Sequence, residues 1–130
     1  MSRFMVFLVA LLLGGFSQLV ISQQVTDPEM TGLSFNDLET RTMDDGRNVR
    51  RIEASTVGLI RVEWPMGTST TPHNHANELV LTVVSGRLRA ISGSREIILE
   101  SGDAVVIPAW VEHSYVALED SVTLEAAGPG

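Results

Sequence analysis

The feature that most constrains the fold is a series of short β-branched and aliphatic runs that begins at Asn48 and continues almost to the end of the chain. Turn signals such as Ser85-Gly86 close the runs, and none of the runs has the apolar period of a helix. Eight short strands at this spacing are typical of an antiparallel sandwich or barrel. The expected strands are residues 49–54, 57–64, 79–84, 87–91, 95–99, 104–107, 114–118 and 122–126.

Alternation within the runs supports this prediction. Leu88 and Ala90 alternate with Arg87 and Arg89, which predicts one buried and one solvent-exposed face for this strand. Residues 48–130 are therefore expected to form a single all-β domain around one core.

Residues 23–47 differ from this domain because they are polar and rich in turn-forming residues. Asp27-Pro28 and Asp44-Asp45-Gly46 interrupt regular structure. We expect a polar arm here, with one short strand near residues 33–35.

The chain opens with the pattern of a secretory signal peptide. Arg3 precedes an apolar run over residues 4–13, and a mixed stretch follows to Ser22. This order predicts that residues 1–22 are a signal peptide and that the mature protein is secreted or periplasmic. The rival interpretation is an uncleaved membrane anchor, since residues 4–21 nearly reach the roughly 20 residues needed to cross a bilayer.

Composition excludes several function classes. The formal net charge is -7, so the basic face of a nucleic-acid-binding protein is missing. All nine basic residues are Arg, which removes Schiff-base chemistry and a phosphate-binding lysine. The chain has no cysteine, so any metal must be held by nitrogen or oxygen ligands.

The chain has only three histidines, and their spacing suggests a metal site. His73 and His75 are two residues apart in an extended segment after Pro72, so both side chains project to the same face. His113 precedes a later strand that could lie alongside. Imidazole suits zinc, iron, copper, nickel and manganese, so the ligands do not identify the ion.

Two stretches resemble the conserved motifs of the cupin family. Residues 67–86, GTSTTPHNHANELVLTVVSG, resemble the first motif, and residues 102–113, GDAVVIPAWVEH, resemble the second. The resemblance implies an antiparallel double-stranded β-helix, the jelly-roll cupin barrel, after the signal segment. It also implies one divalent transition metal (Mn, Fe, Zn, Ni or Cu) bound by His73, His75 and His113.

The fourth ligand departs from the cupin pattern. The usual ligand position falls on Leu79, which cannot coordinate a metal, and the nearest carboxylate, Glu78, is one residue early. A shift of one residue turns a side chain to the opposite face, so Glu78 reaches the metal only if a bulge or loop absorbs the offset. We treat Glu78 as a candidate ligand. Otherwise it is an acid that contacts a metal ligand without touching the metal, or a solvated charge at the rim of the barrel.

Several other residues have open roles. Trp110 replaces the small residue typical of the second motif, and it either lines the entrance or packs in the barrel. Glu78 and Tyr115 are the candidate acid–base residues, with Tyr115 as a proton donor. We expect Arg61, Arg87 and Arg89 to lie on the solvated outer face of the barrel rather than to bind a substrate carboxylate.

Two classes of function follow from these residues. Three imidazoles with a weak or absent fourth ligand leave coordination positions open, as a catalytic site requires. The first hypothesis is therefore a metal-dependent enzyme of the isomerase, lyase or dioxygenase type, acting on a small oxygenated organic acid or sugar derivative. The second is a non-catalytic module that binds a small molecule or a metal, and a metal-free barrel is a third.

The expected partners are a small-molecule substrate or ligand and a second copy of the chain. Small cupins commonly form homodimers, and pairing would protect an exposed edge strand. We expect the polar arm to be the exchanging element, and contact with a membrane only if the N-terminal segment is uncleaved.

Overall fold

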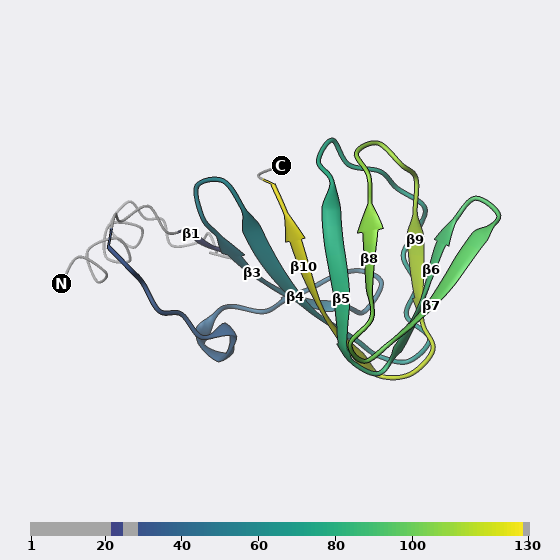
Figure 1. The fold of residues 1–130 in the computed structure, drawn as a ribbon. Helices are drawn as coiled ribbons and strands as arrows, with labels where there is room; N and C mark the ends of the chain where they lie inside the picture. Colours follow the sequence, from purple (N-terminus) through teal and green to yellow (C-terminus); the bar gives the residue numbers. More distant parts are fainter. Residues whose placement is uncertain (1–21, 25–28, 129–130) are drawn as a thin grey trace.

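The computed structural model describes residues 22–24 and 29–128 (Figure 1). The expected signal peptide, residues 1–22, lies outside the described residues except for Ser22, and it stays a prediction. Within the described part of the chain, no helix is both long enough and apolar enough to cross a membrane.

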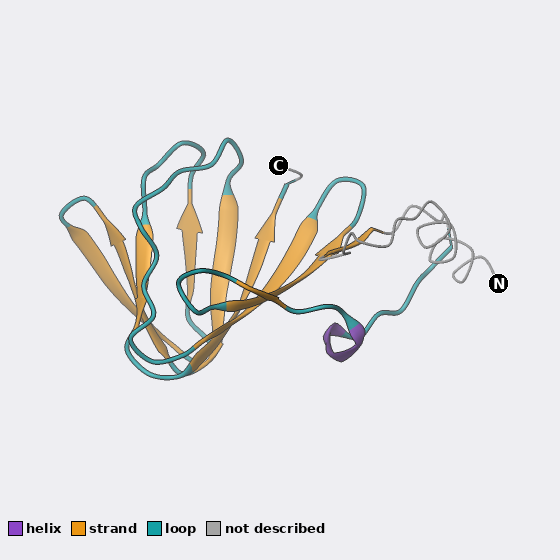
Figure 2. Ribbon diagram, turned by 180° about the vertical axis from the view of Figure 1, so that it is seen from behind, coloured by secondary structure: helices purple, strands orange, loops and turns teal. Residues whose placement is uncertain are grey.

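The fold is all-β and consists of two sheets that meet at one end (Figures 1 and 2). The larger sheet has the order β1-β3-β4-β10-β5-β8, with β2 paired to β3, and the smaller sheet has the order β7-β6-β9. Neighbouring strands are antiparallel except for β1 and β3. The strands are β1 (Ser22–Gln24), β2 (Arg41–Thr42), β3 (Asn48–Glu53), β4 (Gly58–Trp64), β5 (Leu79–Ser85), β6 (Arg87–Ser92), β7 (Arg95–Glu100), β8 (Ala104–Ile107), β9 (Ser114–Ala117) and β10 (Ser121–Ala127).

The eight predicted strands correspond to β3 through β10, but the prediction for the arm was wrong. The short strand expected near residues 33–35 is absent, and a 3-10 turn, η1 (Phe35–Asp37), begins there instead. The Ser34 hydroxyl accepts a hydrogen bond from the Asn36 backbone N–H, which caps this turn. Strands β1 and β2, which contain only three and two residues, were not predicted from the sequence.

The core lies between the inner faces of the two sheets. Leu88, Ala90 and Leu99 of the smaller sheet are buried, as the alternation predicted. The inner face of the larger sheet contributes a row of four side chains that are side by side across β3, β4, β10 and β5. These are Val49, Val62, Thr123 and Val83, all at most 5 % exposed.

The next inward row of the larger sheet carries charge. On each strand this row lies two residues away from the first row. Its members are Arg51, Ile60, Glu125 and Leu81, which are again in register across β3, β4, β10 and β5. Side chains two residues apart share a face of a strand, so Arg51 and Glu125 point to the same side as the buried row beneath them.

An irregular segment between β4 and β5 completes the smaller sheet. Along residues 67–75 the chain runs antiparallel to β9, with isolated bridges at Ser69–Val116 and His73–His113. The backbone N–H of Thr70 donates to Tyr115, and the Thr70 hydroxyl accepts from the Tyr115 N–H. This segment, the long teal loop of Figure 2, is extended as predicted around Pro72 but is not a regular strand.

The turn between β5 and β6 provides a test of the fold. Gly86 has a φ of 90°, and a Cβ there would overlap Ser121 and the Asp120 carbonyl. We expect Gly86→Ala to lower the free energy of unfolding by about 2–4 kcal/mol, because strain and overlap add. Gly93→Ala is the matched control: its φ of 60° is also left-handed, but open space surrounds it. It should cost about 1 kcal/mol. Urea denaturation measures the free energy of unfolding of both variants. Equal losses in Gly86→Ala and Gly93→Ala would contradict this account.

Candidate metal centre

The structure brings the three histidines together. One ring nitrogen from each of His73, His75 and His113 lies within 4.8 Å of the other two. The ring centroids are 4.9 Å apart for His73 and His75, 4.5 Å for His73 and His113, and 5.3 Å for His75 and His113. The grouping expected from spacing is therefore present.

Backbone hydrogen bonds hold this cluster in place. The His73 N–H donates to the His113 carbonyl at 3.0 Å, and the His113 N–H donates to the His73 carbonyl at 2.9 Å. The Trp110 N–H donates to the His75 carbonyl at 2.7 Å. The two motif segments are thus fixed to each other at the histidines themselves.

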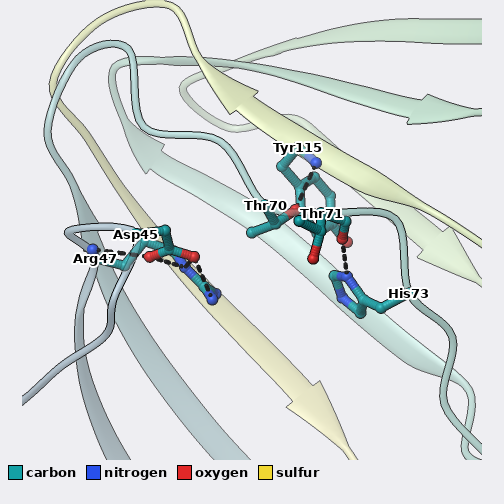
Figure 3. Close-up of polar contacts among 6 residues, drawn as sticks. All are labelled: Asp45, Arg47, Thr70, Thr71, His73 and Tyr115. Carbon is teal, nitrogen blue, oxygen red and sulfur yellow. Dashed lines mark hydrogen bonds and ion pairs between the residues drawn. The ribbon is translucent and has the colours of Figure 1, made fainter.

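Two of the rings are oriented by hydrogen bonds to the backbone. His73 Nδ1 lies 2.7 Å from the Thr71 carbonyl oxygen (Figure 3), and His113 Nδ1 lies 2.9 Å from that of Val111. A carbonyl only accepts, so each Nδ1 carries the proton, and in the neutral ring Nε2 presents its lone pair. His113 Nε2 is buried and has no hydrogen-bond partner among the described residues.

Burial favours the neutral forms of His75 and His113. Burial lowers the pKa of His113 below its ordinary value, and the charge of His73 adds to this effect. Desolvation also lowers the pKa of His75, helped by the charges of His73, His113 and Arg51. Neutral imidazole is the form that binds a metal. The orphaned Nε2 and the three nitrogen donors therefore fit a divalent transition metal, and they do not distinguish Mn, Fe, Zn, Ni or Cu.

Glu78 is not brought to the histidine cluster. Its side chain is exposed just before β5, and it is not in the group of close donor atoms. Leu79 is the buried neighbour and lines the cavity beside His75. The expected role of Glu78 as ligand or acid–base residue has no support in this geometry.

Tyr115 does lie beside the cluster. Its ring centroid is 5.5 Å from that of His113, and the side chain is 3 % exposed. The hydroxyl has no hydrogen-bond partner among the described residues, and burial raises the pKa of Tyr115 well above its usual value. The phenol therefore stays protonated, which suits the predicted role of proton donor.

Trp110 is a rim residue. It is 67 % exposed, so it does not pack inside the barrel. Its φ of 66° lies in the left-handed region, which favours glycine and explains why a small residue is typical at this motif position.

The three arginines flanking the motifs lie on the outer faces, as favoured from the sequence. Arg61 pairs with Glu63 on β4, and Arg87 and Arg89 of β6 pair with Glu100 and Glu96 of β7. Their guanidinium groups do not line the cavities described below.

Glu125 is the site residue that sequence reasoning missed. It lies inward on β10 and lines two cavities, of about 470 Å³ and about 340 Å³. Both cavities also contact His75, Arg51 and Ile60, and the smaller one contacts His73 and Tyr115. Burial raises the pKa of Glu125, while the positive charges of Arg51, His73 and Arg47 oppose the rise. A carboxyl group that shares these cavities with the histidines is placed to exchange protons with a bound molecule.

Metal binding is tested by removing one ligand at a time. We expect His75→Ala and His113→Ala to lower metal affinity by more than about tenfold, since even outer-shell changes cost that much. Elemental analysis and the rise in melting temperature on metal addition measure the loss. Glu78→Gln is the matched control and should keep wild-type metal content, because its side chain is exposed away from the cluster. Loss of metal from Glu78→Gln would contradict the geometry.

Comparison with solved structures supports the fold. KdgF from Halomonas sp. has a TM-score of 0.68 at 24% identity, covering 73% of this chain and 91% of that one. An RmlC-like cupin from Shewanella frigidimarina has a TM-score of 0.69 at 17% identity, with coverages of 81% and 93%. The polyketide cyclase RemF from Streptomyces resistomycificus has a TM-score of 0.67 at 20% identity, with coverages of 77% and 80%. At these identities the likeness concerns the fold alone.

Comparison with protein families gives the assignment. The search of curated proteins found no match. The cupin domain model matches residues 60–126, which include β5 through β9, most of β4 and β10, and all three histidines. The chain therefore belongs to the cupin family.

Proposed function

We propose that this protein is an enzyme that binds one divalent transition metal through His73, His75 and His113. Its substrate is a small oxygenated organic acid or sugar derivative, and its reaction is a proton transfer of the isomerase or lyase type. The observation that supports catalysis is the position of Glu125, whose carboxyl group lines the same cavities as the histidines.

The metal would act as a Lewis acid that polarises a substrate carbonyl oxygen and acidifies the neighbouring C–H bond. Glu125 accepts the proton from that carbon and returns it to an adjacent carbon or oxygen, so no oxidant is consumed. The raised pKa of Glu125 brings the carboxyl group toward the range in which it can both accept and donate. Tyr115, protonated and without a partner among the described residues, donates a hydrogen bond to the substrate.

The apolar floor under the site favours this chemistry. Val49, Val62 and the Trp64 ring line the smaller cavity below the charged row. Trp64 is 2 % exposed, and its indole N–H is satisfied by Thr123. These apolar side chains offer a water molecule no hydrogen-bond partner on this side of the cavity.

The test is hydrogen exchange at carbon, which needs no knowledge of the natural substrate. Metal-loaded protein in D₂O is incubated with pyruvate and 2-oxobutyrate, and NMR follows deuterium uptake next to the carbonyl. Glu125→Gln should reduce the protein-dependent rate by about 10²- to 10⁴-fold, as expected for a lost general base, with unchanged metal content. Glu119→Gln is the matched control, because Glu119 is exposed in the turn before β10.

Other outcomes would redirect the assignment. Exchange that is equal in wild type and Glu125→Gln would refute the proton-transfer role. Oxygen consumption with the same acids would favour the dioxygenase type. Binding of the acids with neither exchange nor oxygen uptake would favour the non-catalytic binding module.

We also propose that the protein is exported after cleavage near Ser22 and that it forms a homodimer. The charged, apolar and polar order of residues 1–22 supports export, and a chain without cysteine tolerates an oxidising compartment. Among the described strands β8 is an edge of the larger sheet, and dimer formation would cover exposed strand edges. Native mass spectrometry of the expressed full chain should give twice the mass of a chain lacking its first residues. A monomeric mass would refute the homodimer, and the mass of an uncleaved chain would refute export with cleavage.

A further inference from the structure

Arg51 is a charged side chain inside the site that neither the metal cluster nor the proton transfer uses. It lies on β3 in the inward row with Ile60 and Glu125, and it lines both cavities. Its charge adds to the effect of desolvation in lowering the pKa of His75, and it opposes the rise that burial causes in the pKa of Glu125. Within residues 29–128, however, its guanidinium forms no hydrogen bond or ion pair, although it offers five donors.

The other arginine at these cavities is already occupied. Arg47 forms an ion pair with Asp45 at 2.9 Å, and its Nε donates to both carboxylate oxygens of Asp45 (Figure 3). Its guanidinium carbon also lies 5.2 Å from the centre of the Trp64 ring. Arg47 is therefore neutralised and held in place. Among the described residues that line the cavities, Arg51 is the cation with free donors.

Glu125 does not neutralise Arg51. No ion pair joins the two side chains, and they are separated by β4. With strands about 4.8 Å apart, their Cα atoms are about 10 Å apart. A molecule lying over Ile60 would therefore meet a guanidinium on one side and the acid–base carboxyl group on the other.

Space at this point of the barrel matches a small molecule. The larger cavity, about 470 Å³, is bordered in part by side chains with little or no bulk, at Ala54, Gly58, Ala76 and Ala127. Glu53 also lines this cavity, and among the described residues it forms no ion pair with Arg51. Gly58 lies next to Ala127 in the strand register, directly beyond Ile60 and Glu125. A volume of this size is at the lower end of ligand pockets in proteins.

We propose that Arg51 binds the carboxylate of the substrate, and that the substrate class is a small carboxylic acid with a second oxygen donor that reaches the histidine-bound metal. This inference rests on the proposed function. Guanidinium and carboxylate match in a two-point, charge-assisted contact, which fixes orientation as well as affinity. Arg51 is a specificity residue in this scheme, while Glu125 remains the acid–base residue.

The experiment compares an acid with its neutral amide. Metal-loaded wild type, Arg51→Gln and Arg95→Gln are titrated calorimetrically with lactate and with lactamide, which have the same size and hydroxyl group. Wild type should prefer lactate by about tenfold or more, and Arg51→Gln should weaken lactate binding by about tenfold while leaving lactamide within about twofold. Arg95→Gln removes the same charge from an exposed position on β7 and should behave as wild type.

The outcomes separate this inference from the proposed function. One contrary result is that metal loads while Arg51→Gln and Arg95→Gln bind lactate equally, and another is that metal loads while wild type shows no preference for lactate over lactamide. Either result means that Arg51 does not bind a carboxylate, and the metal centre is unaffected. If wild type takes up no metal, the proposed function fails, and metal-free protein is titrated with acetate. Acetate binding that Arg51→Gln abolishes and Arg95→Gln retains would sustain the carboxylate site, and its absence would overturn it.

Discussion

The pairing of His73 with His113 is the constraint on which the rest of the site depends. Two reciprocal backbone hydrogen bonds join the residues, each contributing on the order of 1 kcal/mol. The larger contribution is geometric, because the pairing aligns the irregular segment of residues 67–75 with β9 and closes the smaller sheet. Backbone hydrogen bonds therefore hold the three candidate ligands in position.

The larger sheet places two charged side chains in the cavities that the histidines line. Its first inward row, which includes Val62 and Thr123, is buried, and the next row presents Arg51 and Glu125 to the cavity. Placing two charged groups and the partnerless hydroxyl of Tyr115 inside the barrel costs stability, since polar groups lose hydration there. Groups retained at such a cost are typical of a functional site.

The strands and the histidine cluster could be predicted from the sequence, because both depend on local patterns. Turn signals bound the strands, and the spacing of His73 and His75 forces their side chains together. Glu125 was missed because β10 reverses the usual pattern. Its aliphatic residues, Val122 and Leu124, share the face opposite to Thr123, which is 0 % exposed. Alternation alone would assign Glu125 to solvent, and only the pairing of β10 between β4 and β5 places it inside.

The replacement of the usual fourth ligand by Leu79 has a consequence for how the cavity operates. A buried leucine at this position adds apolar surface beside His75 and leaves the histidines as the only close group of donors among the described residues. A metal held by three neutral imidazoles keeps its full positive charge, because no carboxylate ligand offsets it. Together with the charge of Arg51, the charge of a divalent ion exceeds that of the two carboxylates that line the larger cavity, Glu125 and Glu53. With such a metal bound, the cavity of an acidic protein would attract an anion, which is the electrostatic condition for the proposed binding of a small acid.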